Sequence, residues 1–216
     1  METIFKQGTL LAVYKPKGPT SFDIIARIKR MSGVKRVGHA GTLDPLASGV
    51  LVVGIGREAT KKLHEIVAQE KEYEVTIKLG ETSVTDDEER EKTIIASATN
   101  PTSMEVERAV KRFIGVIEQT PPQFSAVKVR GRPAYQSARR GEKIELKSRL
   151  VKIKSVEILH YKYPLLKLRV VTGKGVYIRS LARDIGSILE TGGYVAELER
   201  TRVGEFDLSK AVRMSP

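Results

Sequence analysis

The chain has 216 residues, and its 38 Lys and Arg against 26 Asp and Glu give a formal net charge of +12 at pH 7. Such an excess of positive charge is typical of proteins that bind a polyanion, most often a nucleic acid. The absence of Cys excludes disulfides, thiolate catalysis and Cys-ligated zinc, and three scattered His do not predict a metal site. The sequence contains neither a signal-peptide pattern nor the roughly 20 apolar residues of a membrane span, so we expect a cytoplasmic protein.

The first third of the chain predicts two strands, one helix and one loop. The apolar run at 10–14 ends at a Lys-Pro step and predicts a strand followed by a turn. A helix is predicted from about Thr20, and its expected apolar face consists of Phe22, Ile25, Ile28 and Met31. Residues 37–45 contain two glycines and an Asp-Pro step, which predict a loop, and residues 50–55 predict a buried strand.

The middle of the chain contains its clearest strand. Apolar and polar residues alternate from 73 to 79, which is the pattern of a half-buried strand. A helix is predicted before this strand, at 59–68, and an acidic surface loop after it, at 85–92. Thr102 and Glu105 have the spacing of a capping box and predict the start of another helix.

The last third of the chain predicts a strand pair, a helix and two edge strands. The pair lies at 150–159 and 165–171, the helix begins at about 177, and the edge strands lie at 195–198 and 203–206. Helices and strands mix without a regular βαβ rhythm, which favours an α+β fold around a mixed, largely antiparallel sheet. We expect a single domain over 1–216, with an insertion at about 119–149 that follows no single period.

Four segments carry residues that could perform chemistry, and the last of them is Leu198 with its neighbours 199–204. Residues 38–49 read GHAGTLDPLASG, a glycine-rich turn that presents His39 and Asp44 but lacks the Lys of a phosphate-binding P-loop. Tyr73 begins the alternating strand, where an isolated Tyr is more often a core residue than a catalytic one. Arg179 lies in the first turn of a predicted helix, where the helix dipole disfavours a cation, so we expect an anionic partner. These residues alone do not identify a reaction.

The order of these segments closely resembles the TruB family of bacterial tRNA pseudouridine-55 synthases. The resemblance covers almost the whole chain, and residues 38–49 match the catalytic motif of that family almost letter for letter. The further matching segments, in the same order as in the family, are 15–21, 71–73, 121–128 with 131–141, and 177–181. The resemblance implies an enzyme that isomerises a uridine in the T-arm of tRNA.

The resemblance also implies a role for each matching residue. Asp44 would be the essential carboxylate, and Arg179 would pair with it and keep it ionised. Tyr73 would stack on the target uracil and help to remove its C5 proton, while Leu198 would pack on the other face of the ring. His39 would occupy the space that the extruded base leaves.

The insertion resembles the thumb loop with which the family grips RNA. Between 128 and 149 it carries eight basic residues and two acidic ones, a composition that suits phosphate contacts. The residues that we expect to contact RNA in this thumb are Lys128, Arg130, Arg132, Arg139 and Arg140. The resemblance implies the tRNA T-stem-loop as partner, no cofactor, no metal, no membrane, no obligate protein partner and a monomer.

Two alternatives remain open at this point. A guide-RNA-dependent pseudouridine synthase shares the motif around Asp44, but it uses a C-terminal PUA domain, and the residues after Phe206 are too few for one. A non-catalytic RNA-binding or RNA-folding module would suit the charge of +12 equally well. A carboxylate beside anionic RNA would weaken such a module, so Asp44 favours the enzyme.

Overall fold

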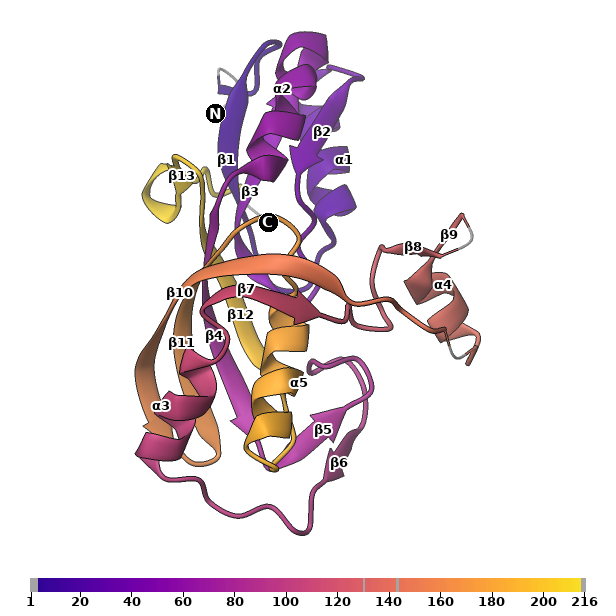
Figure 1. The fold of residues 1–216 in the computed structure, drawn as a ribbon. Helices are drawn as coiled ribbons and strands as arrows, with labels where there is room; N and C mark the ends of the chain where they lie inside the picture. Colours follow the sequence, from indigo (N-terminus) through magenta and orange to yellow (C-terminus); the bar gives the residue numbers. More distant parts are fainter. Residues whose placement is uncertain (1–3, 130, 143, 215–216) are drawn as a thin grey trace. The chain divides into compact units, whose positions relative to one another are not determined.

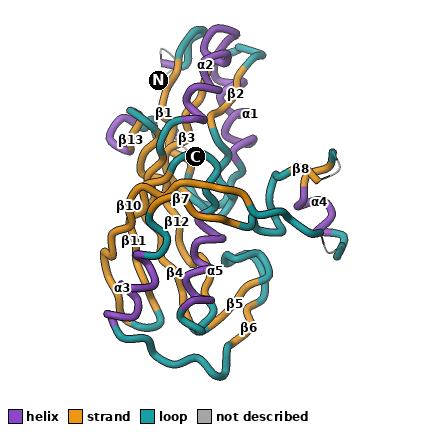
Figure 2. The backbone as a smooth tube through the Cα atoms, viewed as in Figure 1, coloured by secondary structure: helices purple, strands orange, loops and turns teal. Residues whose placement is uncertain are grey.

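The structure is a computed structural model that describes residues 4–129, 131–142 and 144–214. It divides into two compact units, one formed by Met1–Glu74 with Leu198–Pro216 and the other by Val75–Glu197. Figures 1 and 2 show the elements of both units. Two strands, β4 (Lys71–Leu79) and β12 (Gly193–Val203), contribute residues to both units.

The first unit is built on β1 (Leu10–Lys15) and β3 (Ser48–Ile55), which pair antiparallel. The sheet order here is β1-β3-β12-β4, with β12 parallel to β3, so the sheet is mixed. The remaining elements of this unit are β2 (Val37–Ala40), β13 (Phe206–Asp207), α1 (Ser21–Ser32), α2 (Gly56–Ala68) and the 3₁₀ turn Leu208–Lys210.

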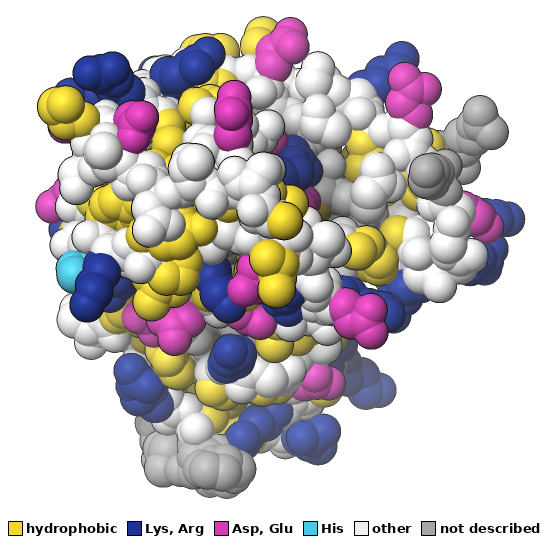
Figure 3. All heavy atoms as spheres, turned by 90° about the horizontal axis from the view of Figure 1, so that it is seen from below, with side chains coloured by type: hydrophobic (Ala, Val, Ile, Leu, Met, Phe, Trp, Pro, Cys, Tyr) yellow, Lys and Arg dark blue, Asp and Glu magenta, His cyan; other side chains and the backbone are white. Residues whose placement is uncertain are grey.

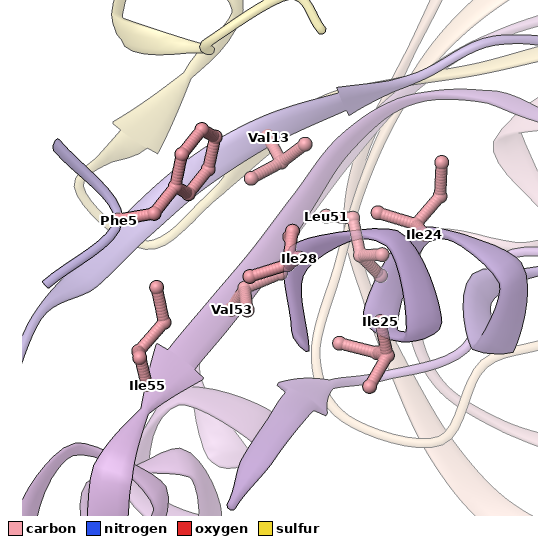
Figure 4. Packing of buried hydrophobic residues seen from close by; sticks show 8 residues of the cluster. All are labelled: Phe5, Val13, Ile24, Ile25, Ile28, Leu51, Val53 and Ile55. Carbon is pink, nitrogen blue, oxygen red and sulfur yellow. The ribbon is translucent and has the colours of Figure 1, made fainter. Parts of the chain in front are cut away.

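The two helices of the first unit bury opposite sides of β3. Val13, Leu51 and Val53 pack with Ile24, Ile25 and Ile28 of α1 in one apolar cluster (Figure 4). The intervening residues Ala12, Val50 and Val52 pack with Leu63 and Ile66 of α2 in another. Successive side chains of a strand point to opposite faces, so β3 needs apolar residues at nearly every position. This explains the continuous apolar run that predicted it.

Helix α1 begins where the sequence predicts. Thr20 and Asp23 form a complete capping box, and Gly33 caps the other end with a left-handed φ of 68°. The predicted apolar face is wrong at one position, because the Phe22 side chain is 72% exposed. Ile24 is buried instead, since the face toward the sheet is centred on Ile24, Ile25 and Ile28.

The second unit contains β4, β11 (Leu165–Thr172), β10 (Arg149–Lys162) and β7 (Gly115–Gln119) in that order beside β12. The ladders between β10 and its two neighbours are antiparallel, which confirms the predicted strand pair and the largely antiparallel sheet. The helices α3 (Ser103–Lys111) and α5 (Ile178–Ile188) confirm the helix starts predicted at Thr102 and at about residue 177. Two short strands, β5 (Glu81–Ser83) and β6 (Lys92–Ile94), pair with each other.

The basic insertion leaves the sheet and returns to it at one place. Gln119, the last residue of β7, pairs with Arg149, the first of β10, so residues 120–148 form an excursion from a closed strand pair. The excursion carries β8 (Lys128–Val129), β9 (Arg132–Pro133) and α4 (Ala134–Arg139). Figures 1 and 2 show it projecting from β7 and β10, and it is called the thumb below.

Four predicted elements differ from the structure. The predicted loop at 37–45 begins with β2, because Val37–Ala40 pair with the edge of β3. The first predicted edge strand, 195–198, belongs to β12, which lies between β3 and β4 in the sheet order, and the second, 203–206, covers the end of β12, a turn and the start of β13. The predicted surface loop at 85–92 is buried at its start, because Asp86 and Asp87 pair with arginines of α5.

None of the described helices is both long and apolar enough to cross a membrane.

Candidate active site

The loop that carries Asp44 is held by the segment 15–21. The buried Lys15 ammonium donates to the carbonyls of Pro16 and Pro45 at 2.9 and 3.3 Å, and the Gly18 amide donates to Pro45 at 2.8 Å. On the other side of Asp44, the Leu43 amide donates to Ser21 Oγ at 2.9 Å, and that hydroxyl donates to the Leu43 carbonyl at 3.1 Å. The backbone is therefore fixed immediately before and after the half-buried Asp44.

Burial lowers the pKa of Lys15 to about 8, while the negative charge of Asp44 opposes this shift. An ammonium in that range is still mostly protonated at neutral pH. Lys15 thus supplies a cation in the electrostatic environment of Asp44. The sequence placed Lys15 in a matching motif but predicted no role for it.

Replacing Ser21 by alanine should loosen the Asp44 loop without removing any predicted catalytic group. The variant leaves the Leu43 amide and carbonyl without their buried partner, which should cost about 1–3 kcal/mol of stability. Because small displacements of reacting groups are costly, the chemical step should slow by about 10-fold to 100-fold. Thermal denaturation and single-turnover kinetics check both effects. Ser32→Ala, at the other end of the same helix, is the control and should keep the wild-type rate. A wild-type rate and melting temperature for Ser21→Ala would contradict the anchoring role.

A buried arginine, Arg200, contacts the glycine-rich segment that leads to Asp44. Its side chain is 1% exposed, with Nε donating to the Val50 carbonyl at 2.8 Å and Nη2 to the Gly41 carbonyl at 3.0 Å. Burial lowers the pKa of Arg200, and Tyr73 and Asp44 oppose that shift. Arg200 therefore has two of the predicted catalytic residues in its immediate surroundings, a feature that the sequence did not predict.

Two glycines of the motif at 38–49 are explained by the structure, Gly49 by Arg200 and Gly41 by its backbone conformation. A Cβ at Gly49 would lie 2.2 Å from the Arg200 carbonyl oxygen, and Gly49 has a φ of +108°. A Cβ at Gly41 would lie at an ordinary contact distance of 3.5 Å from Arg200 Nη1, so it is the φ of +85° that favours glycine there. Only glycine adopts such φ values without strain and leaves room for the neighbouring backbone. Gly49 in particular permits the parallel pairing of β3 with β12.

The other predicted substrate contacts of the first unit lie on β2, β4 and β12. Tyr73 is 8% exposed and is among the groups that oppose the lowering of the Arg200 pKa, and Leu198 is half-buried. His39 is half-buried on β2, and its burial and the nearby Arg200 lower its pKa. The Phe22 ring meets His39 edge-on, with 5.7 Å between centroids and 81° between planes. An aromatic ring as exposed as Phe22 beside a predicted RNA-binding residue is a further candidate contact.

Arg179 is buried in the second unit and is tied to two segments remote from its helix. Nη1 lies 3.5 Å from Oδ2 of Asp87 and donates to the Thr85 carbonyl at 3.0 Å, while Nη2 donates to the Phe124 carbonyl at 2.9 Å. The unfavourable position of Arg179 at a helix start predicts an anionic partner, and Asp87 is such a partner. Pairing with Asp44, which belongs to the first unit, stays a prediction.

Asp86 is a buried carboxylate whose ionisation opposes folding. Burial raises its pKa from 3.8 to about 6, against the opposing effects of Arg183 at 3.0 Å and of Arg179. The folded protein therefore holds this proton more tightly than the unfolded chain. Stability from this group is fully present below about pH 4 and is lost as pH rises through about 6. Asp86 also has a left-handed φ of 59°.

Replacing Asp86 by asparagine should stabilise the protein at neutral pH. The amide removes the ionisation penalty, still accepts from Arg183, and Asn tolerates a left-handed φ. We expect roughly 1–3 kcal/mol at pH 7.5, with the advantage disappearing near pH 4. Chemical denaturation at several pH values measures this. Asp207→Asn is the matched control, because hydrogen bonding lowers the pKa of Asp207 and predicts the opposite sign. Equal stability of Asp86→Asn and wild type at both pH values would contradict the prediction.

The described basic residues predicted to grip RNA are all exposed on the thumb. They are Lys128, Arg132, Arg139 and Arg140, while Arg130 lies outside the described residues. Arg139 stacks over the Tyr135 ring at 5.6 Å, and Arg140 lies 4.0 Å from Glu142. On the face shown in Figure 3, Lys and Arg are interspersed with Asp and Glu. That face therefore presents no single basic patch, and the thumb is the better candidate for an RNA contact.

Residues at the start of α5 hold the root of the thumb. Gln119 accepts from the Tyr177 amide at 2.8 Å and donates to the Tyr177 carbonyl at 3.1 Å. The Thr120 carbonyl accepts from Ser180 at 2.8 Å and from Arg183 at 2.9 Å. The helix that presents Arg179 is thus joined to the segment from which the thumb departs.

Solved structures with a similar fold identify the class of protein. The chain superposes on a chain of a Cbf5-Nop10-Gar1 complex with a TM-score of 0.76 and 29% identity, covering 99% of this chain and 54% of that one. A chain of an H/ACA RNP bound to a substrate RNA containing 2′-deoxyuridine gives a TM-score of 0.70 at 26% identity, covering 94% and 50%. The chain thus spans about half the length of these solved chains. A structure described as a pseudouridylate synthase shares the fold, with a TM-score of 0.50 at 17% identity over 96% of this chain and 68% of that one. The mixed sheet with a carboxylate in a glycine-rich loop is that of the pseudouridine synthases, which are isomerases.

Family models and curated relatives define the family. The N-terminal domain of the TruB family pseudouridylate synthases matches residues 29–178, and the C-terminal domain of tRNA pseudouridylate synthase B matches residues 179–216. The chain belongs to the TruB family of pseudouridine synthases. A protein of Parabacteroides distasonis named tRNA pseudouridine synthase B is 47% identical over 98% of this chain and 92% of its own length. A protein of the same name from Thermobifida fusca is 44% identical over 95% of this chain and 72% of its own length.

Proposed function

We propose that the protein isomerises uridine 55 in the T-arm of tRNA to pseudouridine. The observation that supports this most is the setting of Asp44, which is fixed between Leu43 and Pro45 in a loop that resembles the family's catalytic motif. The name of the curated relatives, tRNA pseudouridine synthase B, supports tRNA as the substrate. Identity to those relatives exceeds identity to the chains of the Cbf5 and H/ACA structures, so a guide-RNA-dependent activity is not favoured.

The reaction is an isomerisation that breaks one bond to the ribose and forms another. The glycosidic bond from N1 of uracil to C1′ breaks, a bond from C5 to C1′ forms, and C5 loses a proton while N1 gains one. Asp44 is the nucleophile that makes this exchange possible, and Tyr73 accepts the C5 proton. Because substrate and product have the same composition, the reaction needs no redox partner, metal or cofactor.

The uridine must leave its stack before Asp44 can reach it, which costs a few kcal/mol. Tyr73 and Leu198 hold the extruded uracil between them, and His39 fills the vacated space. Arg179 keeps Asp44 ionised. Lys128, Arg132, Arg139 and Arg140 of the thumb bind phosphates, which makes affinity depend on salt. We infer a monomer that acts in the cytoplasm without an obligate protein partner.

Tritium release from RNA labelled at C5 of uridine tests the proposal. A tRNA transcript with uridine at position 55 should release one equivalent of tritium, and an isolated T-arm hairpin should also react. A transcript with cytidine at position 55 is the matched control and should release none. Equal release from both transcripts would contradict the assigned position, and no release from either, with tRNA bound, would contradict the activity.

A further inference from the structure

Phe22 is an exposed aromatic residue that the packing of its own helix does not explain. The side of α1 that faces the sheet is filled by Ile24, Ile25 and Ile28 (Figure 4), whereas Phe22 is 72% exposed. A hydrophobic staple at the start of a helix uses the fourth helical residue, which in α1 is the buried Ile24. Phe22 is the second helical residue, so its ring contributes neither to the core nor to a staple.

The Phe22 ring lies at the edge of the predicted site in the first unit. The preceding residue, Ser21, forms two hydrogen bonds with the backbone of Leu43, at 2.9 and 3.1 Å, directly before Asp44. The ring itself meets His39 edge-on, with 5.7 Å between the ring centroids. The Nδ1 atom of His39 is buried and has no hydrogen-bond partner among the described residues, so packing against Phe22 helps to fix the imidazole. Phe22 is thus adjacent both to the anchor of the Asp44 loop and to the residue predicted to fill the space of the extruded base.

The exposed face of α1 continues from Phe22 to two cations. Phe22, Lys29 and Arg30 are all exposed, and spacings of seven and eight residues place them on one side of the helix. Seven helical residues span roughly 10 Å, a distance that a short stretch of RNA can bridge. Between Asp23 and Asp44 the chain has five Lys or Arg and no Asp or Glu, so this segment is strongly positive. Cations in the last turn also suit the helix dipole, so they indicate a ligand only together with the exposed ring.

An exposed aromatic ring followed by cations has the chemistry that binds a single RNA strand. Any base can stack on such a ring because every base has a π-face, while Lys and Arg bind the backbone phosphates. When the target uridine is extruded, its neighbours lose a stacking partner. Phe22 offers a new partner beside His39, where that loss is expected. Charge and position therefore both favour RNA as the occupant of this face.

We propose that Phe22 and the exposed face of α1 form a second RNA-binding surface, in addition to the thumb. An unpaired base next to the extruded uridine stacks on Phe22, and Lys29 and Arg30 bind neighbouring phosphates. This role rests on the proposed function, because it takes the T-arm of tRNA as the ligand. Phe22 takes no part in breaking or forming bonds, so it contributes to RNA affinity and leaves the rate of the chemical step unchanged.

Binding of a T-arm hairpin, measured by fluorescence anisotropy beside single-turnover tritium release, tests the ring. Phe22→Leu keeps an apolar side chain but loses the π-face, so it should weaken binding about 10-fold, with the rate at saturating protein within about threefold of wild type. Phe22→Tyr keeps the ring and should bind as wild type does. Met104→Ala is the matched control, because Met104 is 65% exposed at the second position of α3, after an equivalent capping box. It should change neither affinity nor rate.

The salt dependence of binding tests the two cations. Replacing both, by Lys29→Gln and Arg30→Gln, should remove two phosphate contacts and flatten the plot of log affinity against log salt concentration by about 1.4, at roughly 0.7 for each contact to a single strand. Phe22→Leu should keep the wild-type slope, because stacking releases no counterions. An unchanged slope in the double variant would overturn the phosphate contacts.

Three results would overturn the stacking role of Phe22. They are wild-type affinity of Phe22→Leu, an equal loss of affinity in Met104→Ala, and a slower rate at saturating protein with unchanged affinity. The last result would place Phe22 in the catalytic arrangement. Absence of tritium release from the wild-type protein, with binding still dependent on Phe22, would instead contradict the proposed function and leave the RNA-binding surface standing.

Discussion

Gly49→Ala is expected to leave the chain largely unfolded at 25 °C. The new methyl group would lie 2.2 Å from the Arg200 carbonyl oxygen and 2.7 Å from its amide nitrogen, and both are backbone atoms that cannot move aside singly. Relief would require separating β3 from β12 at the register of Gly49 with Arg200. Backbone strain at φ +108° adds to the clash, so we expect a loss above about 4 kcal/mol, a large part of the stability of a typical domain. Circular dichroism and chemical denaturation measure it.

The Gly115→Ala variant distinguishes the effect of backbone strain from the effect of a steric clash. Gly115 has nearly the same conformation, with φ +112°, but no atom lies within 4 Å of the position that a Cβ would take. This variant should lose only the strain energy, about 1–2 kcal/mol, and remain folded. Equal losses for the two variants would mean that the approach of β12 to Gly49 is not what requires glycine there.

Asp44→Asn is expected to abolish tritium release while leaving the protein folded and able to bind tRNA. The amide keeps the size of the side chain, but it cannot act as an anionic nucleophile, so the single-turnover rate should fall by about 10⁴-fold or more. The backbone contacts of Leu43 and Pro45 do not involve the Asp44 side chain, and the loop should keep its place. RNA affinity should be equal or higher, because one negative charge near the phosphates is removed.

Asp207→Asn is the control for the loss of a carboxylate in the same unit. Asp207 caps the 3₁₀ turn at Leu208–Lys210, and an amide can still accept from that turn. This variant should release tritium at the wild-type rate. If Asp44→Asn also retained that rate, another group would have to be the nucleophile. If it lost RNA affinity in parallel with activity, Asp44 would be a binding residue.

Much of the fold could be predicted from the sequence because the signals are local. The alternation from Tyr73 to Leu79 reports the two faces of β4, and every second residue of that strand is buried. The capping boxes at Thr20 and Thr102 mark helix starts through contacts within one turn. Such contacts depend on neighbouring residues, so they are readable before the chain folds.

The predictions failed where a distant partner changes the meaning of a residue. Phe22 has helical spacing with Ile25 and Ile28, yet the direction of the sheet leaves it exposed beside His39. The sequence predicts two short edge strands, at 195–198 and 203–206. Residues 195–203 instead belong to one inner strand, where the charged side chains find partners on β4, Glu197 accepting from Thr76 and Arg202 pairing with Glu72.

The motif at 38–49 and the further matching segments were sufficient to name the family and to predict Asp44 as the catalytic carboxylate, because the spacing of glycines around Asp44 is specific and can be read directly from the sequence. The sequence alone does not show why those positions require glycine. Gly49 is required by the backbone of a strand some 150 residues later, and Arg200 of that strand reaches the carbonyls of Val50 and Gly41 only after β3 and β12 pair. Asp87 likewise meets Arg179 only after folding. Buried charges depend on partners from several strands, so their positions are known only when the chain has folded.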